Sequence, residues 1–284
     1  MLQPALVNYA DSIDEKNYRV TFHEHIQYEA NKQFDDGDYY SIPWFADIWR
    51  SGFRQKMATA GISIGKSDLV LDICCGQGYL GEMIARESQA RVICCDLSQP
   101  QLHRLRSRVN GSGAIFPCIT DVLHVPFRAQ SFDLVLGNSF LHHLADVPAA
   151  LNELRQLIRP GGYLVVFHEP SITSTFWESF PLSLLKDTSS RGGNFTDLWM
   201  FKPHDLLDLS RSAGFQSASV LGGGILGSIF VNWYLILGMK LHWESRSMVY
   251  PAYVLRNWLN YIELGPIGRR KWNRSPSLML IAQA

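Results

Sequence analysis

The sequence lacks an excess of charge of either sign. Its 284 residues include 26 basic and 26 acidic side chains, so the formal net charge is zero. A protein that binds a phosphate backbone usually shows a strongly basic face, because much of its binding free energy comes from counterion release. The charge balance therefore argues against nucleic acid as a partner. The hydrophobic content of 46% is that of an ordinary globular protein.

The sequence also lacks a disulfide framework and a secretory leader. Its cysteines are odd in number and lie in two adjacent pairs and a singleton within apolar runs, unlike those of secreted disulfide scaffolds. The N-terminal stretch has no basic head and no apolar segment of signal-peptide length. We therefore expect a cytoplasmic protein. The five cysteines are Cys74, Cys75, Cys94, Cys95 and Cys118.

A metal site is the alternative interpretation of the cysteine pairs, because the two strands that carry them are expected to be neighbours. Structural zinc ligands usually come from C-x-x-C loops. Adjacent strand residues instead point to opposite faces of a sheet. We interpret the cysteines as small buried residues and expect no metal site.

One long uncharged stretch, Leu221–Met239, has about the length that a membrane span requires. Its glycines and its central Asn232 argue against a span, and a further strand pattern follows it. A buried helix that covers a hydrophobic pocket has the same composition. We expect such a cover, while peripheral membrane contact remains open.

Short apolar runs alternate with stretches of helical period from Leu69 to Phe167, which is typical of βαβ units and a mostly parallel sheet. Similar patterns continue to the C-terminus. The expected strands are Leu69–Cys74, Arg91–Asp96, Ala114–Cys118, Phe132–Gly137, Tyr163–Phe167, Phe215–Leu221 and Ser277–Gln283. The expected helices are Tyr79–Glu87, Gln99–Arg108, Val147–Ile158 and Lys202–Ala213.

These patterns predict an α/β fold with a doubly wound, mostly parallel seven-stranded sheet. Residues 1–60 are polar and aromatic, and we expect a helical lid there, with helix after Ser41-Ile42-Pro43. Residues 61–221 and 275–284 form the expected core. Residues 222–274 form an expected helical insertion that covers the acceptor pocket.

A glycine-rich turn between the first strand and the first helix is the sharpest local motif, Asp72-Ile73-Cys74-Cys75-Gly76-Gln77-Gly78-Tyr79-Leu80-Gly81. Glycines there allow a ligand to approach the backbone at a helix N-terminus. Gly76, Gly78 and Gly81 also spell the GxGxxG of dinucleotide enzymes, and Asp96 ends the next strand, where such enzymes hold a ribose. Asp72 separates the two interpretations, because its carboxylate repels a pyrophosphate and attracts a cationic amino group.

Three further motifs stand at consistent places: Asp121-Val122 after the third strand, Phe132-Asp133-Leu134-Val135 in the fourth, and Arg159-Pro160-Gly161-Gly162 before the fifth. Together with the glycine turn and Asp96, they resemble class I S-adenosylmethionine-dependent methyltransferases. The resemblance is to the small-molecule type that includes the ubiquinone and menaquinone methyltransferases, and it covers roughly residues 60–220. The family's usual first glycine is Cys74 here, which favours the quinone-type branch.

The resemblance implies S-adenosylmethionine as the cofactor and assigns residues to its parts. Asp72 and the turn with Cys74, Gly76 and Gly78 would hold the methionine end, and Asp96 would take both ribose hydroxyls. Leu97 and Val122 would flank the adenine, Asp121 would accept its exocyclic amine, and Asn138 completes the expected cofactor site.

Three histidines are expected near the acceptor. His142 and His143 follow the fourth strand and His168 follows the fifth, so all three lie at carboxyl ends of strands, where open α/β sheets bind ligands. An imidazole can remove the proton of an alcohol or phenol as it is methylated. Structural roles for these residues, such as packing under the sheet, remain open.

The sequence therefore predicts methyl transfer to a small or medium-sized, partly hydrophobic acceptor, such as a natural product, quinone or lipid-like molecule. It leaves the acceptor atom open among O, N and C. The Asn/Asp-Pro-Pro-aromatic motif of nucleic-acid amino methyltransferases is absent where Asn138-Ser139-Phe140-Leu141 stands. Two alternatives remain: non-methyl chemistry on the same cofactor, such as cyclisation, and a non-catalytic partner subunit.

Overall fold

The computed structural model describes residues 7–8, 43–144, 146–171, 199–222 and 277–284, with helical positions at 251, 254–255 and 258–259. The rest of the expected lid and nearly all of the expected insertion therefore lie outside the described residues. Leu221–Met239 is described only to residue 222. Among the described residues, no helix is both long enough and apolar enough to cross a bilayer.

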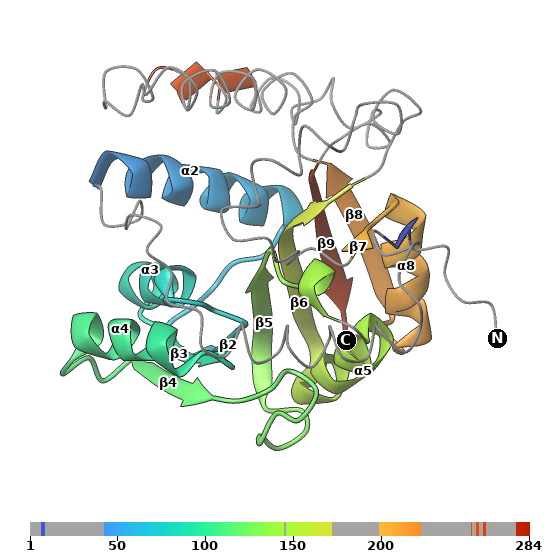
Figure 1. Ribbon diagram of the computed structural model, residues 1–284. Coiled ribbons are helices and arrows are strands. Elements are labelled where there is room, and N and C mark those ends of the chain that lie inside the picture. The colour runs from blue at the N-terminus through green and yellow to red at the C-terminus, as the bar shows by residue number, and fades with distance from the viewer. Residues whose placement is uncertain are drawn as a thin grey trace.

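A seven-stranded sheet forms the centre of the part of the chain that the structure describes. Its strand order is β4-β3-β2-β5-β6-β9-β8, and only β9 runs antiparallel to its neighbours (Figure 1). This confirms the predicted fold class. The strands are β2 (Leu69–Ile73), β3 (Arg91–Asp96), β4 (Ile115–Ile119), β5 (Phe132–Asn138), β6 (Ile158–Pro170), β8 (Ser217–Gly222) and β9 (Ser277–Gln283).

Helices cover both faces of this sheet. One face packs against α2, α3 and α4, and the other against α5 and α8, each through its own apolar cluster. The 3₁₀ turn η2 follows β5, and β1 (Val7–Asn8) pairs with β7 (Trp199–Met200). The helices are α2 (Pro43–Ala60), α3 (Tyr79–Ser88), α4 (Gln99–Val109), η2 (Leu141–His143), α5 (Val147–Leu157) and α8 (Pro203–Ser212).

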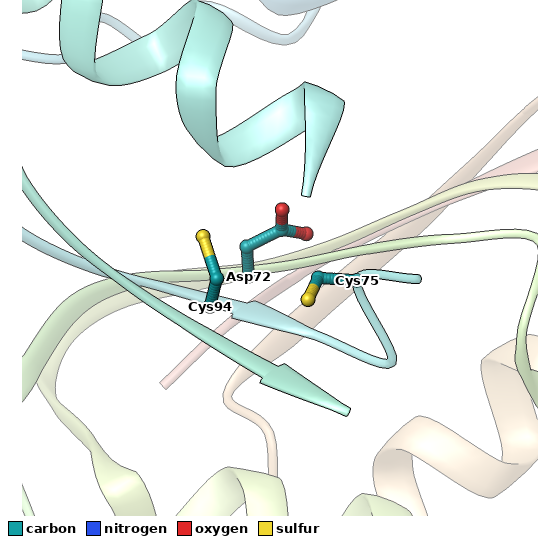
Figure 2. Close-up of side chains that lie close together, drawn as sticks. All are labelled: Asp72, Cys75 and Cys94. Carbon is teal, nitrogen blue, oxygen red and sulfur yellow. The ribbon is translucent and has the colours of Figure 1, made fainter. Parts of the chain in front are cut away.

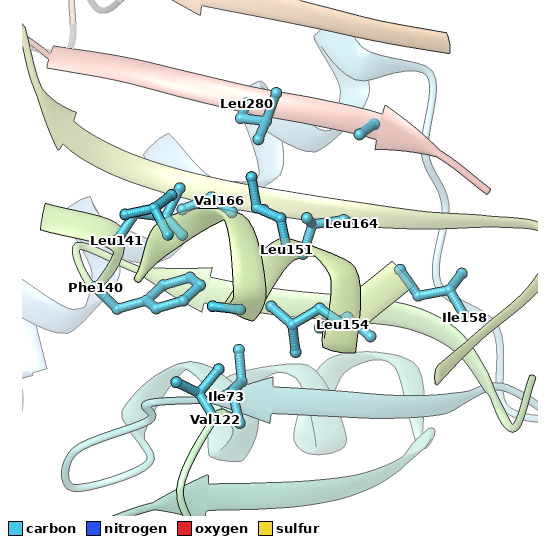
Figure 3. Close-up of a cluster of buried hydrophobic side chains, with 14 of the residues drawn as sticks. Ile73, Val122, Phe140, Leu141, Leu151, Leu154, Ile158, Leu164, Val166 and Leu280 are labelled. Atoms are coloured by element: carbon cyan, nitrogen blue, oxygen red, sulfur yellow. The ribbon is translucent and has the colours of Figure 1, made fainter. Parts of the chain in front are cut away.

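Burial on both faces explains why the central strands are continuous apolar runs. Val135 of β5 and Val166 of β6 face α5, whereas Leu136 and Val165 belong to the opposite cluster, and all four are fully buried. Figure 3 shows the α5 side, where Leu151 and Leu154 pack on the strands. Such strands are typical of parallel sheets covered by helices on both sides.

The predicted elements are present, and their ends differ by a few residues. The predicted first strand included Cys74, which instead leaves the strand with a left-handed backbone, φ +50°. The helix predicted to reach Ile158 ends at Leu157, because β6 begins at Ile158, which pairs with Phe132. The helix expected after Ser41-Ile42-Pro43 is confirmed as α2, which starts at Pro43.

The strand order places the switch point of the sheet between β2 and β5. From β2 the chain winds outward through β3 to β4, and it then returns to β5 on the other side of β2. Ligands of open α/β sheets bind outside the carboxyl ends of the strands at this point. Helix α2 lies across that end of the sheet, where the ring of Phe53 packs 5.4 Å from that of Phe167 (Figure 1).

Candidate active site

The glycine turn is shaped by left-handed backbone at three positions: Cys74 (φ +50°), Gly76 (φ +55°) and Gly78 (φ +70°). A Cβ at Gly78 would lie 2.5 Å from Leu105 Cδ2, so α4 closes that side of the turn. A Cβ at Gly76 would meet no atom within 4 Å. The turn is therefore closed at Gly78 and open at Gly76, which fits a ligand that approaches the backbone there.

Asp72 is buried beside the turn, with 1% of its surface exposed. Its Oδ2 accepts a 2.8 Å hydrogen bond from the Gly81 backbone N–H. Burial raises the pKa of Asp72 to about 7; the Gly81 hydrogen bond lowers this pKa, and the charge of Asp96 raises it. A cationic ligand group would restore the charged form, and the amino group of S-adenosylmethionine has that chemistry.

Asp96 connects the end of β3 to the glycine turn. Its Oδ2 accepts from the Gly76 N–H at 2.7 Å, and its Oδ1 accepts from the Ser98 N–H at 2.8 Å. The carboxylate is therefore fixed at the carboxyl end of β3, beside the open position of the turn. A carboxylate oxygen has two lone pairs, so a carboxylate at this place suits the hydroxyls of a ribose.

Arg108 supports the turn, a role that the sequence analysis missed. Its guanidinium donates to the Gln77 carbonyl, forms a 3.1 Å ion pair with Glu82, and lies 4.1 Å from the ring centre of Tyr79. The residue comes from the last turn of α4. A basic residue at a helix end has many surface explanations, so the sequence offered no signal for this contact.

The expected adenine site lies at the ends of β3 and β4. Val122 is 5% exposed and belongs to the core cluster, and Leu97 is half-buried. Asp121 is more open, with 40% of its side chain exposed, and its Oδ1 accepts from the Leu123 N–H at 2.9 Å. These residues follow neighbouring strands, as predicted, and their roles toward adenine stay predictions.

Two cysteines approach Asp72 more closely than the sequence analysis expected. Among the described residues, the potential ligand atoms of Asp72, Cys75 and Cys94 lie within 4.8 Å of one another (Figure 2). Burial raises the pKa of the Cys75 thiol well above its usual range, and its contact with Cys94 raises it further. Since thiolates are the metal ligands, this environment favours protonated, packed thiols.

His168 is held between Asn138 and Lys56. Its Nδ1 lies 2.7 Å from Asn138 Oδ1, and its Nε2 lies 2.6 Å from Lys56 Nζ. An ammonium only donates, so Nε2 accepts, and a neutral imidazole then carries its proton on Nδ1 and donates it to Asn138. The predicted cofactor residue Asn138 thus contacts a predicted catalytic histidine. Lys56, from the expected lid, was not anticipated.

His142 is held by Glu169, which was not among the site residues predicted from the sequence. Glu169 is fully buried, and its carboxylate accepts from the backbone N–H groups of Phe140, Leu141 and His142. The His142 Nδ1 donates to the same carboxylate at 2.8 Å. Glu169 therefore caps η2 and fixes the His142 ring. The sequence signal was a carboxylate two residues after the apolar run predicted as the fifth strand; in the structure Glu169 lies within β6.

His143 is the half-buried member of the pair, and its ring centre lies 4.0 Å from that of His142. The structure thus brings the three candidate histidines to the carboxyl ends of β5 and β6. It places Asp72, Asp96 and the glycine turn at the carboxyl ends of β2 and β3. The two groups lie on opposite sides of the switch point, as a cofactor site and an acceptor site would.

This arrangement, with an acidic strand end, a left-handed glycine turn and a second carboxylate on the neighbouring strand, is the one that the resemblance to class I methyltransferases predicts. Residues 71–166 match the family described as "Methyltransferase domain". The chain therefore carries a methyltransferase domain of the S-adenosylmethionine-dependent kind. The predicted family and cofactor are confirmed at this level.

Curated relatives match about half of the chain. An uncharacterized methyltransferase of Mycobacterium tuberculosis (strain H37Rv) is 32% identical over 48% of this chain and 66% of its own length. Demethylmenaquinone methyltransferase of Thermobifida fusca is 34% identical over 42% of this chain and 51% of its own length. Mitochondrial arginine-hydroxylase NDUFAF5 of Mus musculus is 28% identical over 54% of this chain and 43% of its own length. The matches thus span less than two thirds of these relatives.

Solved structures agree on the fold. Phosphoethanolamine N-methyltransferase 2 of Haemonchus contortus, in complex with S-adenosyl-L-methionine, superposes with a TM-score of 0.63 at 14% identity. The likeness covers 92% of this chain and 59% of that one. At this identity the comparison shows the fold alone.

Proposed function

We propose that the protein transfers a methyl group from S-adenosylmethionine to a small or medium-sized, partly hydrophobic acceptor of the natural-product, quinone or lipid-like kind. The cofactor, when bound, supplies a methyl group on a sulfonium. Asp72 carries the proposal: it is a buried carboxylate with a raised pKa, beside an open glycine turn. That site suits a cationic amino group and disfavours the pyrophosphate of a dinucleotide.

The chain's own residues align the reactants in this proposal. Asp72 and the turn hold the amino acid end of the cofactor, and Asp96 holds its ribose. Methyl transfer is an in-line displacement, so alignment and exclusion of water supply most of the rate. The histidines at the ends of β5 and β6 handle the proton of an acceptor that has one to lose.

The acceptor class rests on the composition of two segments and on one relative. We propose residues 1–60 as a lid and residues 222–274 as a cover of the acceptor pocket, because both are rich in aromatic residues and the second is also apolar. The relative named demethylmenaquinone methyltransferase supports a quinone-like acceptor. Peripheral membrane contact and a cytoplasmic location belong to the same proposal.

The test is incubation of the full chain with methyl-labelled S-adenosylmethionine and a metabolite extract. We expect S-adenosylhomocysteine and a labelled product heavier by one methyl group. A second candidate is a reaction other than methyl transfer, because one relative is named an arginine hydroxylase. Cofactor binding without S-adenosylhomocysteine formation, across extracts of polar and apolar metabolites, would favour that candidate or a non-catalytic subunit.

A further inference from the structure

Helix α2 brings a positive charge to the carboxyl end of β6. Phe53 and Met57 of α2 are buried in the core, and the half-buried Lys56 lies between them in the sequence. Its Nζ lies 5.7 Å from the ring centre of Phe167 and 2.6 Å from Nε2 of His168. This contact joins residues that are 112 positions apart, so the fold places the ammonium there.

The backbone around this contact is strained on both strands. His168 and Ser139 each have φ +59°, a left-handed conformation that non-glycine residues seldom adopt. Ser139 Oγ donates to the His168 carbonyl, and the register of β6 against β9 shifts between Val166 and Glu169. Such strain and such irregularities are concentrated next to functional sites, where they direct a side chain toward its target.

The hydrogen bonds of His168 determine which chemistry Lys56 and His168 can carry out together. Asn138 accepts from His168 Nδ1, so the lone pair of the imidazole is on Nε2, directed at Lys56. An acceptor that uses His168 as its base must therefore enter where Nζ and Nε2 face each other. The hydrogen bond that Lys56 donates to Nε2 then passes to the oxygen of the acceptor, and this bond is strongest when that oxygen is becoming negative.

We propose that Lys56 and His168 bind the methyl acceptor and select an acidic hydroxyl group, of the phenol or enol class. The inference rests on the proposed function and specifies its substrate. Lys56 Nζ holds the oxygen, and His168 Nε2 takes its proton. The oxygen forms the new O–CH₃ bond, the S–CH₃ bond breaks with its electron pair left on sulfur, and the imidazolium later loses its proton to water.

Other acceptor types fit this pair less well. A protonated amine is repelled by the ammonium, and a neutral amine offers no developing negative charge for it to stabilise. An aliphatic alcohol is too weakly acidic for an imidazole to deprotonate efficiently, because proton transfer works best between groups of matched pKa. The charge of Lys56 therefore selects for an oxygen that ionises readily.

The test compares phenols with anilines of the same shape, beginning with 4-nitrophenol and 4-nitroaniline and continuing through a panel of larger pairs. Binding is measured to the full chain saturated with S-adenosylhomocysteine, and the absorbance band of bound nitrophenolate reports its ionisation. We expect the wild type to prefer phenols by about tenfold or more. Lys56→Met should abolish the preference and the anion band. Lys66→Met, which removes an exposed lysine elsewhere, should retain both.

His168→Asn separates the two roles, because asparagine tolerates the left-handed backbone at this position. With the acidic 4-nitrophenol it should still show the anion band through Lys56, while turnover of phenols that are not ionised in free solution should fall about a hundredfold, because these need the base. Equal binding of phenols and anilines by the wild type, or an unchanged preference in Lys56→Met, would overturn the inference. Calorimetry with S-adenosylhomocysteine alone tests the cofactor site, so absence of that binding would count against the proposed function instead.

Discussion

Acidification below about pH 7 should weaken S-adenosylmethionine binding through Asp72. In the free protein the pKa of this buried carboxyl is raised to about 7, chiefly by burial. The ammonium of the cofactor favours the charged carboxylate, so binding lowers this pKa and releases a proton. Affinity should then fall by up to tenfold per pH unit below 7, which is about 20-fold between pH 7.5 and 5.5.

Calorimetry in buffers of different ionisation enthalpy measures both quantities, the affinity and the number of protons released. Asp72→Asn is the matched control, because it keeps the shape and an oxygen for the Gly81 N–H. It should bind about ten- to a hundredfold more weakly at pH 7.5, and the gap should narrow toward pH 5.5. Affinity that does not change with pH, or proton uptake on binding, would refute the reasoning.

The same pKa difference makes a prediction about stability. The folded-state pKa of about 7 lies above the ordinary aspartate pKa of 3.8, so ionisation of Asp72 opposes folding. Its contribution to stability is fully present below pH 3.8 and is lost as the pH rises through 7. A difference of about 3 units corresponds to at most about 4 kcal/mol. Without cofactor, Asp72→Asn should therefore melt at a higher temperature than the wild type at pH 8, and the difference should vanish near pH 4.

Three further predictions concern the remaining site residues. Asp96→Ala should weaken S-adenosylmethionine binding about ten- to a hundredfold in calorimetry, because ribose contacts and the Gly76 hydrogen bond are lost together; tight NAD binding instead would contradict the family role. Glu169→Gln should lower the free energy of unfolding by about 2–4 kcal/mol in urea melts, since an amide NH₂ would face the η2 N–H donors. Replacement of the true base among His142, His143 and His168 with Gln should lower kcat about a hundred- to ten-thousandfold with nearly unchanged cofactor affinity. Near wild-type kcat and pH profiles in all three would exclude histidine base catalysis.

Much of the fold was predictable because its signals are local. Apolar runs of strand length alternate with helical periods from β2 to β6, and most of the turns between them carry a glycine or a proline. The cofactor half of the site has the same character, since Asp72 and the glycine turn lie within ten consecutive residues. Asp96 and Asn138 end two other strands and Asp121 follows a third, and a position at a strand end is itself a sequence pattern.

The acceptor half was less predictable because its contacts join distant segments. Nothing in the pattern around Lys56 indicates that it meets a histidine 112 residues later. Glu169 caps η2 across 27 to 29 positions, and a glutamate before proline has an ordinary meaning in turns. The irregularity at His168 arises from register between β6 and β9, which depends on a strand at the far end of the chain.

The cofactor half of the site was more predictable than the acceptor half because the two ligands make different kinds of contact. A cofactor held by backbone N–H groups and strand-end carboxylates needs a turn of fixed shape, so its residues stay close together in the sequence. In the site that we propose for the acceptor, the side chains converge from α2, β5 and β6. The contact between Lys56 and His168 therefore carries more information about the substrate than the glycine turn does, because the turn is compatible with every acceptor of this fold.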